Sequence, residues 1–404
     1  VVFDILRNKL YSNPILAVCR EISSNSRDAH REVGKFDVPC RIVLPNVLDS
    51  NIRFIDEGPG ISPDRIENVF IKYGSSTKRE DNIQVGSFGC GAKSIYSYSQ
   101  DFTIETVHNG VKYNYSCYID ETRVGKLALL SSEKTDATNG TEIIIPVKSK
   151  DFQAFAEGVE FVTRHWSVRP IITGSSSFRY QDIEFNLKGT NWAITKSDGN
   201  YRKNIKLIND GIEYPLDITA IKNYANYDVF NSVYGTVYLY FGVGDLSLQA
   251  SREAVHLDKK TQTKIEERLG ELFRDLVQNI QEHIDSLPDL WTANCYYNNQ
   301  LSKTFERVQS LGDFTWRGSP LTYGELKVKD ADVYTFTQLY GNKSKYSSKV
   351  KNYISFSEHV AVYQNDLGFA PTVRNVTSAF ENNKAITTTE KILKDSAGIP
   401  INLT

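Results

Sequence analysis

The chain is short of several features that would place it in a special class of protein. Its 404 residues contain no long apolar run, and the longest purely aliphatic stretches, at residues 15–18 and 127–130, have only four residues. A membrane-spanning helix needs about 20 apolar residues. The 25 glycines and 12 prolines are too few for a collagen-like or low-complexity chain. We therefore expect a protein that does not cross a membrane, while contact with a membrane surface stays open.

Cysteine, methionine and net charge are also scarce. The five cysteines are odd in number and widely spaced, without a CxxC or Cys/His pattern, which argues against a disulfide framework and fits a reducing compartment. The 47 basic and 49 acidic residues leave a formal charge of −2, so no overall field favours a nucleic acid or an anionic membrane as partner. Methionine is absent, even at position 1, so we expect a fragment or a sequence that has lost residues.

What is present predicts a folded chain of mixed α/β class. Hydrophobic residues make up 40% and charged residues 24%, which excludes wholesale disorder, and the length predicts two or three domains. Residues 1–150 mix helix and strand patterns. Apolar residues at helical spacing predict an amphipathic helix over residues 15–30, and a short apolar run predicts a buried strand over residues 53–55.

The remaining chain divides into two further regions. Residues 151–292 open with a helical stretch, continue as strands and close with a long helix that ends before Pro288. Residues 293–404 are rich in Tyr, Asn, Ser and Lys and stop abruptly, as a truncated domain would. We therefore expect domain boundaries near residues 150 and 292.

Three polar side chains share one stripe of the first predicted helix. Glu21 and Asn25 are four residues apart, and Asn25 and Asp28 are three apart, so all three lie beside its apolar face. This arrangement suits general-base chemistry next to a bound hard cation, because glutamate polarises water and an amide oxygen binds the metal. Taken alone, the stripe is more typical of a solvated polar face.

Two glycine-containing motifs border predicted strands. Asp56, Gly58 and Gly60 follow the first strand, where a carboxylate can accept hydrogen bonds from the amine of a base and the glycines let the backbone approach closely. Gly140 and Thr141 lead into a later strand, where the hydroxyl could bond a base directly or through water. Taken separately, the motifs are also typical of a Gly-Pro turn and of a hairpin turn.

A glycine-rich loop precedes a second predicted helix that begins near Ala92. Closely spaced glycines before a helix offer backbone N–H groups to an anion, the helix dipole adds to this, and Lys93 supplies a positive charge. The loop lacks the Gly-Lys-Ser/Thr ending of a P-loop and the framing of a dinucleotide fingerprint, and its alternative is a plain flexible loop. The candidate phosphate-binding residues are Gly86, Ser87, Phe88, Gly89, Cys90, Gly91, Ala92 and Lys93.

In this order, the four motifs resemble the nucleotide-binding boxes of the GHKL ATPase superfamily, which groups DNA gyrase B, heat-shock chaperones, histidine kinases and MutL. The resemblance implies a Bergerat fold, an α/β sandwich that binds ATP and Mg²⁺, followed by a transducer domain and a partial C-terminal α/β region. It implies that Glu21 is the general base, Asn25 the Mg²⁺ ligand and Asp56 the residue that reads adenine. The other implied ATP-binding residues in these boxes are Asp28, Gly58, Gly60 and Thr141.

The resemblance also implies a lid over the nucleotide at residues 61–85. Within it, Ser75, Ser76 and Lys78 look like the lid motif of MutL-type proteins. Lys93, which brings a positive charge to the phosphates, counts with Glu21 among the implied catalytic residues. Hydrolysis would then drive lid closure and domain rotation, which in this superfamily often accompany formation of a homodimer.

Arg252 lies in a Ser-Arg-Glu segment after a predicted strand of the second region. A guanidinium that reaches the γ-phosphate from another domain can sense the triphosphate and stabilise its transfer. The alternative is a surface ion pair with Glu253 or a neighbour. The segment resembles that of the chaperone branch, in which the arginine of the middle domain reaches ATP, and this implies a catalytic role for Arg252 and argues against a histidine kinase.

Several stretches within residues 1–290, including residues 86–102 and 251–258, are similar to the rIIA-type lysis-inhibition proteins of T-even bacteriophages, and the most diagnostic are residues 29–30 and 93–99. This resemblance implies a phage protein in the cytoplasm of a bacterial host, associated peripherally with the inner membrane and linked to control of lysis. Two alternatives stay open: a nucleotide-sensing scaffold with little turnover, and a DNA-associated clamp of the MutL or topoisomerase type, which the neutral charge disfavours. The sequence identifies no specific protein partner.

Overall fold

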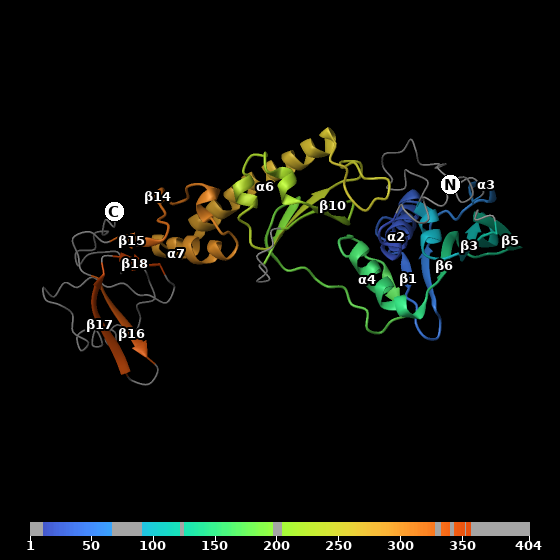
Figure 1. Ribbon diagram of the computed structural model, residues 1–404, viewed down its shortest axis with the longest axis horizontal. Coiled ribbons are helices and arrows are strands. Elements are labelled where there is room, and N and C mark those ends of the chain that lie inside the picture. The colour runs from blue at the N-terminus through green and yellow to red at the C-terminus, as the bar shows by residue number, and fades with distance from the viewer. Residues whose placement is uncertain are drawn as a thin grey trace. The chain divides into compact units, whose positions relative to one another are not determined.

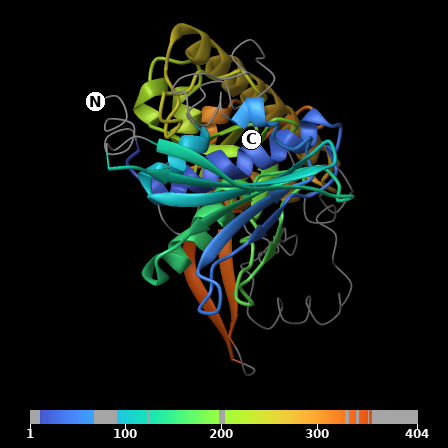
Figure 2. The same cartoon turned by 90° about the vertical axis from the view of Figure 1, so that its right-hand side faces the viewer.

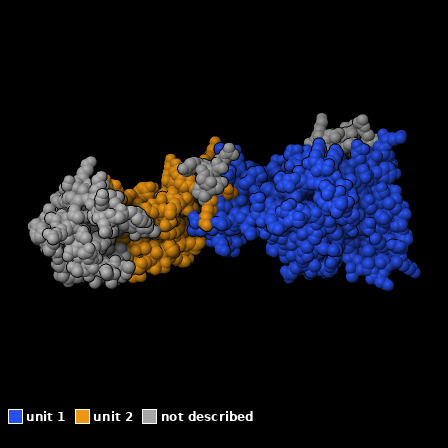
Figure 3. Space-filling model, turned by 90° about the horizontal axis from the view of Figure 1, so that it is seen from below, with its two compact units in different colours: residues 1–195, 204–221, 237–269 blue, residues 196–203, 222–236, 270–404 orange. Residues whose placement is uncertain are grey.

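The computed structural model describes residues 11–66, 91–121, 125–196, 204–327, 333–339, 343–351 and 353–356. Figure 3 colours the two compact units into which the chain divides. Unit 1 comprises residues 1–195, 204–221 and 237–269, and unit 2 comprises residues 196–203, 222–236 and 270–404. All the site residues predicted from the sequence belong to unit 1. The domain boundaries near residues 150 and 292 stay a prediction.

A seven-stranded sheet with the order β5-β4-β3-β6-β2-β1-β7 forms the base of unit 1 (Figure 1). Neighbouring strands are antiparallel except β1 and β7, which are parallel. Burial alternates along β2, β3 and β6, as it does in a sheet with one covered face. The strands are β1 (Arg41–Val43), β2 (Asn51–Asp56), β3 (Asp101–His108), β4 (Val111–Ile119), β5 (Gly125–Lys134), β6 (Gly140–Pro146) and β7 (Ile171–Thr173).

Helix α2 (Pro14–Glu32) lies across one face of this sheet, as Figure 2 shows, and α4 (Phe152–Thr163) packs against α2. Gly158 permits this packing, because a Cβ atom at that position would lie 3.0 Å from Cys19 Sγ. The first predicted helix is thereby confirmed, and the mixed α/β class is confirmed as well. Short helical segments complete this part of the unit: α3 (Pro63–Ile66), η2 (Gly91–Ser97) and η3 (Ser149–Asp151).

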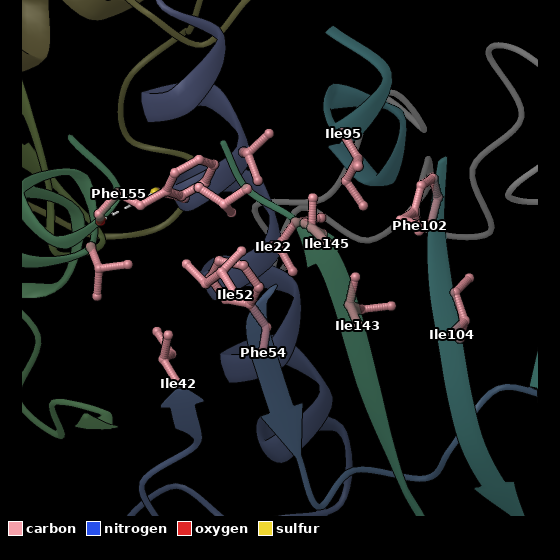
Figure 4. Packing of buried hydrophobic residues seen from close by; sticks show 14 of the residues in the cluster. Ile22, Ile42, Ile52, Phe54, Ile95, Phe102, Ile104, Ile143, Ile145 and Phe155 are labelled. Atoms are coloured by element: carbon pink, nitrogen blue, oxygen red, sulfur yellow. Dashed lines mark hydrogen bonds between the residues drawn. The ribbon is translucent and has the colours of Figure 1, made fainter. Parts of the chain in front are cut away.

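The hydrophobic core lies between α2, α4 and the covered face of the sheet. In Figure 4, Ile22 of α2 lies over Ile52 and Phe54 of β2 and over Ile143 and Ile145 of β6. Four of these five side chains are at most 2% exposed, and Ile143 is 7% exposed. Each such burial contributes about 1.5–3 kcal/mol. The core therefore fixes the rotation of α2 about its own axis, which decides where its polar residues point.

A second sheet in unit 1 has the order β11-β10-β12-β9-β8. The β10–β11 hairpin turns at Asp210 and Gly211, which both have positive φ (49° and 79°), as a tight two-residue hairpin turn requires. Residues 242–258 then connect β12 to the long helix α6 (Lys259–Ser286). The strands are β8 (Phe185–Lys188), β9 (Trp192–Thr195), β10 (Asn204–Asn209), β11 (Ile212–Leu216) and β12 (Thr236–Phe241), and η4 (Ile218–Ile221) follows β11.

Unit 2 contains most of α6 and a small core of its own, built from Trp291, Cys295, Leu326 and Phe356. Helix α6 ends at Ser286, as the sequence predicts from Pro288. The further helices are α5 (Tyr227–Phe230), α7 (Leu290–Cys295), the π-helix η5 (Tyr296–Gln300), η6 (Leu301–Lys303) and η7 (Val308–Leu311). The strands are β13 (Thr315–Trp316), β14 (Ser319–Pro320), β15 (Glu325–Lys327), β16 (Val333–Leu339), β17 (Lys343–Lys351) and β18 (Tyr353–Ser355).

Two sequence predictions can be compared directly with these elements. The helix expected near Ala92 is a 3₁₀ helix, η2, which spans only seven residues. Within the described stretches, no helix is both long enough and apolar enough to span a bilayer.

Candidate active site

Local chemistry sets where α2 begins and how it is oriented. Asn13 caps the helix, since its Oδ1 accepts a hydrogen bond from the backbone N–H of Leu16 (3.0 Å). Pro14 suits the first turn, where its missing N–H is not needed. Val18 and Ile22 are buried in the core. The helix therefore has a fixed start and a fixed rotation.

The polar stripe of α2 is buried. Glu21 and Asp28 are 2% and 0% exposed, and Asn25 is half-buried. Asp28 also accepts a long hydrogen bond from Arg31 (3.4 Å). A solvated polar face would be exposed, so burial rules out this alternative for Glu21 and Asp28. Buried charged groups need a charged partner, hydrogen bonds or a ligand, so Glu21 and Asp28 require such an interaction.

Arg252 is the partner of Glu21. Its Nη1 donates a hydrogen bond to Glu21 Oε2 at 2.9 Å, and the two side chains are 6% and 3% exposed. Glu21 Oε1 is buried and accepts no hydrogen bond from any group in the described part of the chain. The structure thus brings together two residues that the sequence separates by 231 positions. The surface ion pair between Arg252 and Glu253 is not what forms.

Burial governs the ionisation of Glu21. Desolvation raises the pKa of its carboxyl group above the ordinary glutamate value, although the charges of Arg252 and Arg20 lower it, and the charge of Asp28 adds to the rise. A carboxylate with a raised pKa is a stronger base than an exposed one. The environment of Glu21 therefore suits proton abstraction.

The two glycine-containing motifs meet in the sheet. Asp56, at the end of β2, is the direct partner of Thr141 in β6, which is paired on its other side with Thr106 of β3. The hydroxyl groups of Thr141 and Thr106 are 3.1 Å apart. Asp56 Oδ1 accepts a hydrogen bond from the N–H of Gly58 (2.9 Å), which shapes the turn after β2. A carboxylate and a hydroxyl that are remote in sequence thus lie side by side.

Each glycine of these motifs allows a close approach within the protein itself. A Cβ atom at Gly58 would lie 2.6 Å from Ala29 Cβ of α2, and one at Gly140 would lie 2.4 Å from the carbonyl oxygen of Asp56. Gly60 has a φ of +72° and presses against the carbonyl of Val107. These contacts dock the turn on α2 and on β3, so the glycines are required for packing even before a ligand is considered.

We expect Gly58→Ala to lower the free energy of unfolding by about 1–3 kcal/mol, because the new methyl group must displace Ala29 or the turn. ATP affinity should fall with it, since the turn carries Asp56. Urea unfolding and ATP titration measure the two effects. Gly270→Ala at a half-buried position of α6 is a matched control, and it should stabilise the helix slightly because its Cβ meets nothing closer than 3.5 Å. Unchanged stability of Gly58→Ala would contradict the packing role.

The predicted phosphate loop and lid are described only at their margins. Gly91, Ala92 and Lys93 form the start of η2. The remaining predicted residues lie outside the described part of the chain: Ser75, Ser76, Lys78, Gly86, Ser87, Phe88, Gly89 and Cys90.

Residues 12–143, which include Glu21, Asp56 and Thr141, match a known family of proteins. The matching family model is described as "Histidine kinase-, DNA gyrase B-, and HSP90-like ATPase". The chain carries an ATPase domain of the GHKL type. The GHKL superfamily predicted from the four motifs is therefore confirmed at this level, and ATP hydrolysis is the activity of such a domain.

The GHKL domain also has curated relatives. A subunit of "Type 2 DNA topoisomerase 6" from Saccharolobus islandicus is 26% identical over 200 residues, covering 44% of this chain and 36% of the relative. The protein of the same name from Saccharolobus solfataricus is 25% identical over 192 residues with the same coverage. The chain thus spans about a third of the length of these relatives. Among solved structures, the ATPase region of Saccharomyces cerevisiae topoisomerase II matches with a TM-score of 0.42 and 14% identity, over 63% of this chain and 84% of that one.

A clamp on the GHKL helix α2 was missed by sequence reasoning. Arg27 and Arg31 both bind the carboxylate of Asp210, at the tip of the β10–β11 hairpin, and Arg27 Nη1 also donates to the carbonyl of Asp210 (2.9 Å). The guanidinium of Arg27 lies 4.1 Å from the ring centre of Trp166. The only sequence signal was the Asp-Gly pair of a hairpin turn, which predicts the turn but not its partner.

A buried histidine likewise joins α2 to the turn that follows β2. His30 Nε2 accepts a hydrogen bond from the N–H of Glu57 (2.7 Å), and its Nδ1 lies 2.9 Å from the carbonyl oxygen of Val38. Because a carbonyl oxygen can only accept a hydrogen bond, Nδ1 carries the proton and Nε2 is unprotonated. His30 therefore positions the turn that contains Asp56 and Gly58 relative to the helix that contains Glu21.

Proposed function

We propose that the chain hydrolyses ATP with Glu21 as the general base and uses the turnover to rearrange the parts of the molecule that contact α2. The observation that carries the proposal is the buried Glu21 carboxylate, with one oxygen bound by Arg252 and the other accepting no hydrogen bond from the described residues. An acceptor in this state can bind and polarise a water molecule. The GHKL family match supports the same assignment.

In the proposed reaction, Glu21 accepts a proton from the attacking water. The water oxygen forms a bond to the γ-phosphorus, the bond from that phosphorus to the β-phosphate oxygen breaks, and ADP leaves. Arg252 is the cation that contacts the base, and in turning from Glu21 to the phosphate it would stabilise the charge of the transferred group. The buried surroundings strengthen both interactions.

The proposed nucleotide contacts follow from the same arrangement. Asp56 and Thr141, which are neighbours across β2 and β6, support a role in holding the adenine base. Gly91 and Ala92 at the start of η2 would contribute to the phosphate loop with Lys93, and residues 61–85 with Ser75, Ser76 and Lys78 would form the lid.

Asn25 is the proposed protein ligand for Mg²⁺. The described residues contain no cluster of three or more His, Cys, Asp or Glu side chains that could form a metal site of its own. This fits a Mg²⁺ ion that is held mainly by substrate phosphates and water, with few protein ligands. When bound, the ion would neutralise phosphate charge.

We further propose that the turnover serves a process on double-stranded DNA. The curated relatives are named as subunits of a DNA topoisomerase, which favours the DNA-associated alternative over the scaffold. A homodimer, as implied by the superfamily resemblance, is part of this proposal. The phage lysis-control and membrane role implied by the rIIA resemblance stays a prediction, and the relatives described above do not support it.

The first experiment is ATP binding and hydrolysis by the wild-type chain, with Mg²⁺ or with a chelator, and with or without linear double-stranded DNA. We expect Mg²⁺-dependent release of phosphate that rises when DNA is added. Binding without turnover would replace the proposal with the nucleotide-sensing scaffold. Turnover without a response to DNA would remove only the DNA part, and failure to bind ATP would overturn the whole proposal.

A further inference from the structure

The loop that carries Arg252 has a defined shape. Its residues 248 and 255 form an antiparallel bridge, and the N–H of Gln249 donates to the carbonyl of Ala254 (3.0 Å). The N–H of Arg252 donates to the carbonyl of Gln249 (2.8 Å). These bonds make a small hairpin whose tip, residues 250–253, ends with Arg252 and Glu253. At its base, the N–H of Ser247 donates to Thr261 Oγ1 in the first turn of α6 (2.9 Å).

Arg252 has an unusual backbone conformation within this tip. Its φ is +54°, in the left-handed region that residues other than glycine seldom occupy, and the residue is 5% exposed. Such a conformation costs free energy and persists only where the surroundings hold it. Something must therefore keep the tip in place.

Glu253 makes the contacts that keep the hairpin tip in place. Its carboxylate accepts hydrogen bonds from Ser12 N (2.9 and 3.1 Å to its two oxygens), from Ser12 Oγ (3.0 Å) and from Asn13 N (3.1 Å). The acceptor is negatively charged and lies at the N-terminus of α2, where the helix dipole favours an anion. The neighbouring Arg252 meanwhile reaches Glu21 on the same helix.

Arg252 and Glu253, two successive residues of opposite charge, thus contact α2 and its N-terminal end at two places. Glu253 binds Ser12 and Asn13, directly before the first residue of the helix, and Arg252 binds the proposed base. The contact of Glu253 is not needed to cap the helix, because Asn13 already provides the cap for Leu16. The four hydrogen bonds of Glu253 instead fix the hairpin tip against the helix.

We propose that Glu253 is a positioning residue for ATP hydrolysis: by anchoring the hairpin tip to Ser12 and Asn13, it holds the backbone of Arg252 next to α2, from where the guanidinium contacts Glu21 and can turn to the γ-phosphate. This inference rests on the proposed function, in which Glu21 is the base and Arg252 stabilises the transferred phosphoryl group. Glu253 itself touches neither the base nor, in this proposal, the substrate. Its effect on turnover passes through Arg252.

The test is a kinetic double-mutant cycle on the full chain. Glu253→Ala should lower kcat by about 10-fold, the equivalent of one charged hydrogen bond, with KM changed by no more than about 2-fold. In the Arg252→Ala background, the same change should alter kcat by less than about 2-fold, because the residue through which it acts is gone. Glu253→Gln keeps an oxygen that can accept from the two N–H groups and should recover part of the loss.

Asp245→Asn is the matched control in the same loop. Its carboxylate accepts a hydrogen bond from the N–H of Gly242 (2.8 Å), so the variant also removes one charge from the loop, but at a distance from the tip in sequence. We expect its kcat to remain within about 2-fold of the wild type. An equal loss in Asp245→Asn and Glu253→Ala would show that general loosening of the loop is responsible and would overturn the positioning role.

Hydrogen exchange without nucleotide provides a readout that does not depend on turnover. Glu253→Ala should speed exchange at the amides of Ser12 and Asn13 and in residues 249–254, whereas Asp245→Asn should leave Ser12 and Asn13 unchanged. If the wild type fails to hydrolyse ATP, the proposed function fails, and with it the role in catalysis. If the wild type hydrolyses ATP and Glu253→Ala matches it, or if the two losses add in the double variant, the positioning role alone is overturned.

Discussion

Glu21→Gln is expected to lower kcat for ATP hydrolysis by about 10²–10⁴-fold, because the neutral amide cannot accept a proton from the attacking water. ATP affinity should change by less than about 3-fold, since Glu21 acts on the water and not on the nucleotide. The side-chain oxygen of glutamine can still accept the hydrogen bond from Arg252, so the fold should be kept. Phosphate release and ATP titration on the same preparation measure the two quantities.

The pH dependence of turnover by the wild type is a second test of the role of Glu21. Burial raises the pKa of Glu21, and the base is active only when ionised. Turnover should therefore fall, as the pH is lowered, at a higher pH than an ordinary glutamate would give. Glu32→Gln is the matched control, since Glu32 stands at the end of the same helix in an exposed pair with Arg65. A Glu21→Gln variant that retains wild-type turnover would remove Glu21 from the mechanism.

Glu213→Gln is expected to cost about 3 kcal/mol of folding free energy, the usual effect of breaking a buried ion pair from one side. The Glu213 carboxylate is 2% exposed and binds two cationic side chains, Arg164 after α4 and Lys206 of β10, and the ring of His165. The variant leaves the positive charges of Arg164 and Lys206 close together without the carboxylate that neutralises them. Urea unfolding near pH 7 measures the loss.

The same carboxylate should make stability depend on pH in a defined direction. Burial alone would raise the pKa of Glu213, but the hydrogen bond with His165 and the charges of Arg164 and Lys206 lower it to about 2. Its stabilising effect is then fully present above the unfolded-state pKa near 4.5 and is lost as the pH falls toward 2. The exposed Glu267, paired with Lys264 on α6, supplies the control Glu267→Gln. If Glu213→Gln and the wild type lose stability equally between pH 4.5 and 2, the assigned role is wrong.

Local pattern was enough to predict the elements that carry the site. The apolar spacing around Val18 and Ile22 set both the extent of α2 and the side on which Glu21 lies, because helical periodicity is a property of nearby residues. The strand that ends at Asp56 was predicted on the same basis. The four motifs, read as a set, led to the GHKL domain that the family match confirms.

Partners remote in sequence could not be predicted in this way. Asp210 meets Arg27 and Arg31 across about 180 residues, and no periodicity relates a hairpin tip to a helix that forms so much earlier in the chain. The reason why a glycine is required at a position could not be predicted from the sequence either. Gly58 was interpreted as letting the backbone approach a ligand closely, whereas the structure shows that it first makes room for Ala29, as Gly140 makes room for the backbone of Asp56. The roles assigned to Asn25 and Lys93 stay predictions.

The parallel pairing of β7 with β1 has a consequence for the order in which the molecule matures during synthesis. The strand at residues 41–43 cannot pair with its partner at residues 171–173 until the whole of α4 has left the ribosome, so the first sheet is completed late. Arg252 and Glu253 emerge about eighty residues later still. A nascent chain would thus acquire α2 and the first sheet well before it acquires Arg252, and under the proposed function it could hold ATP during that interval without being equipped to hydrolyse it.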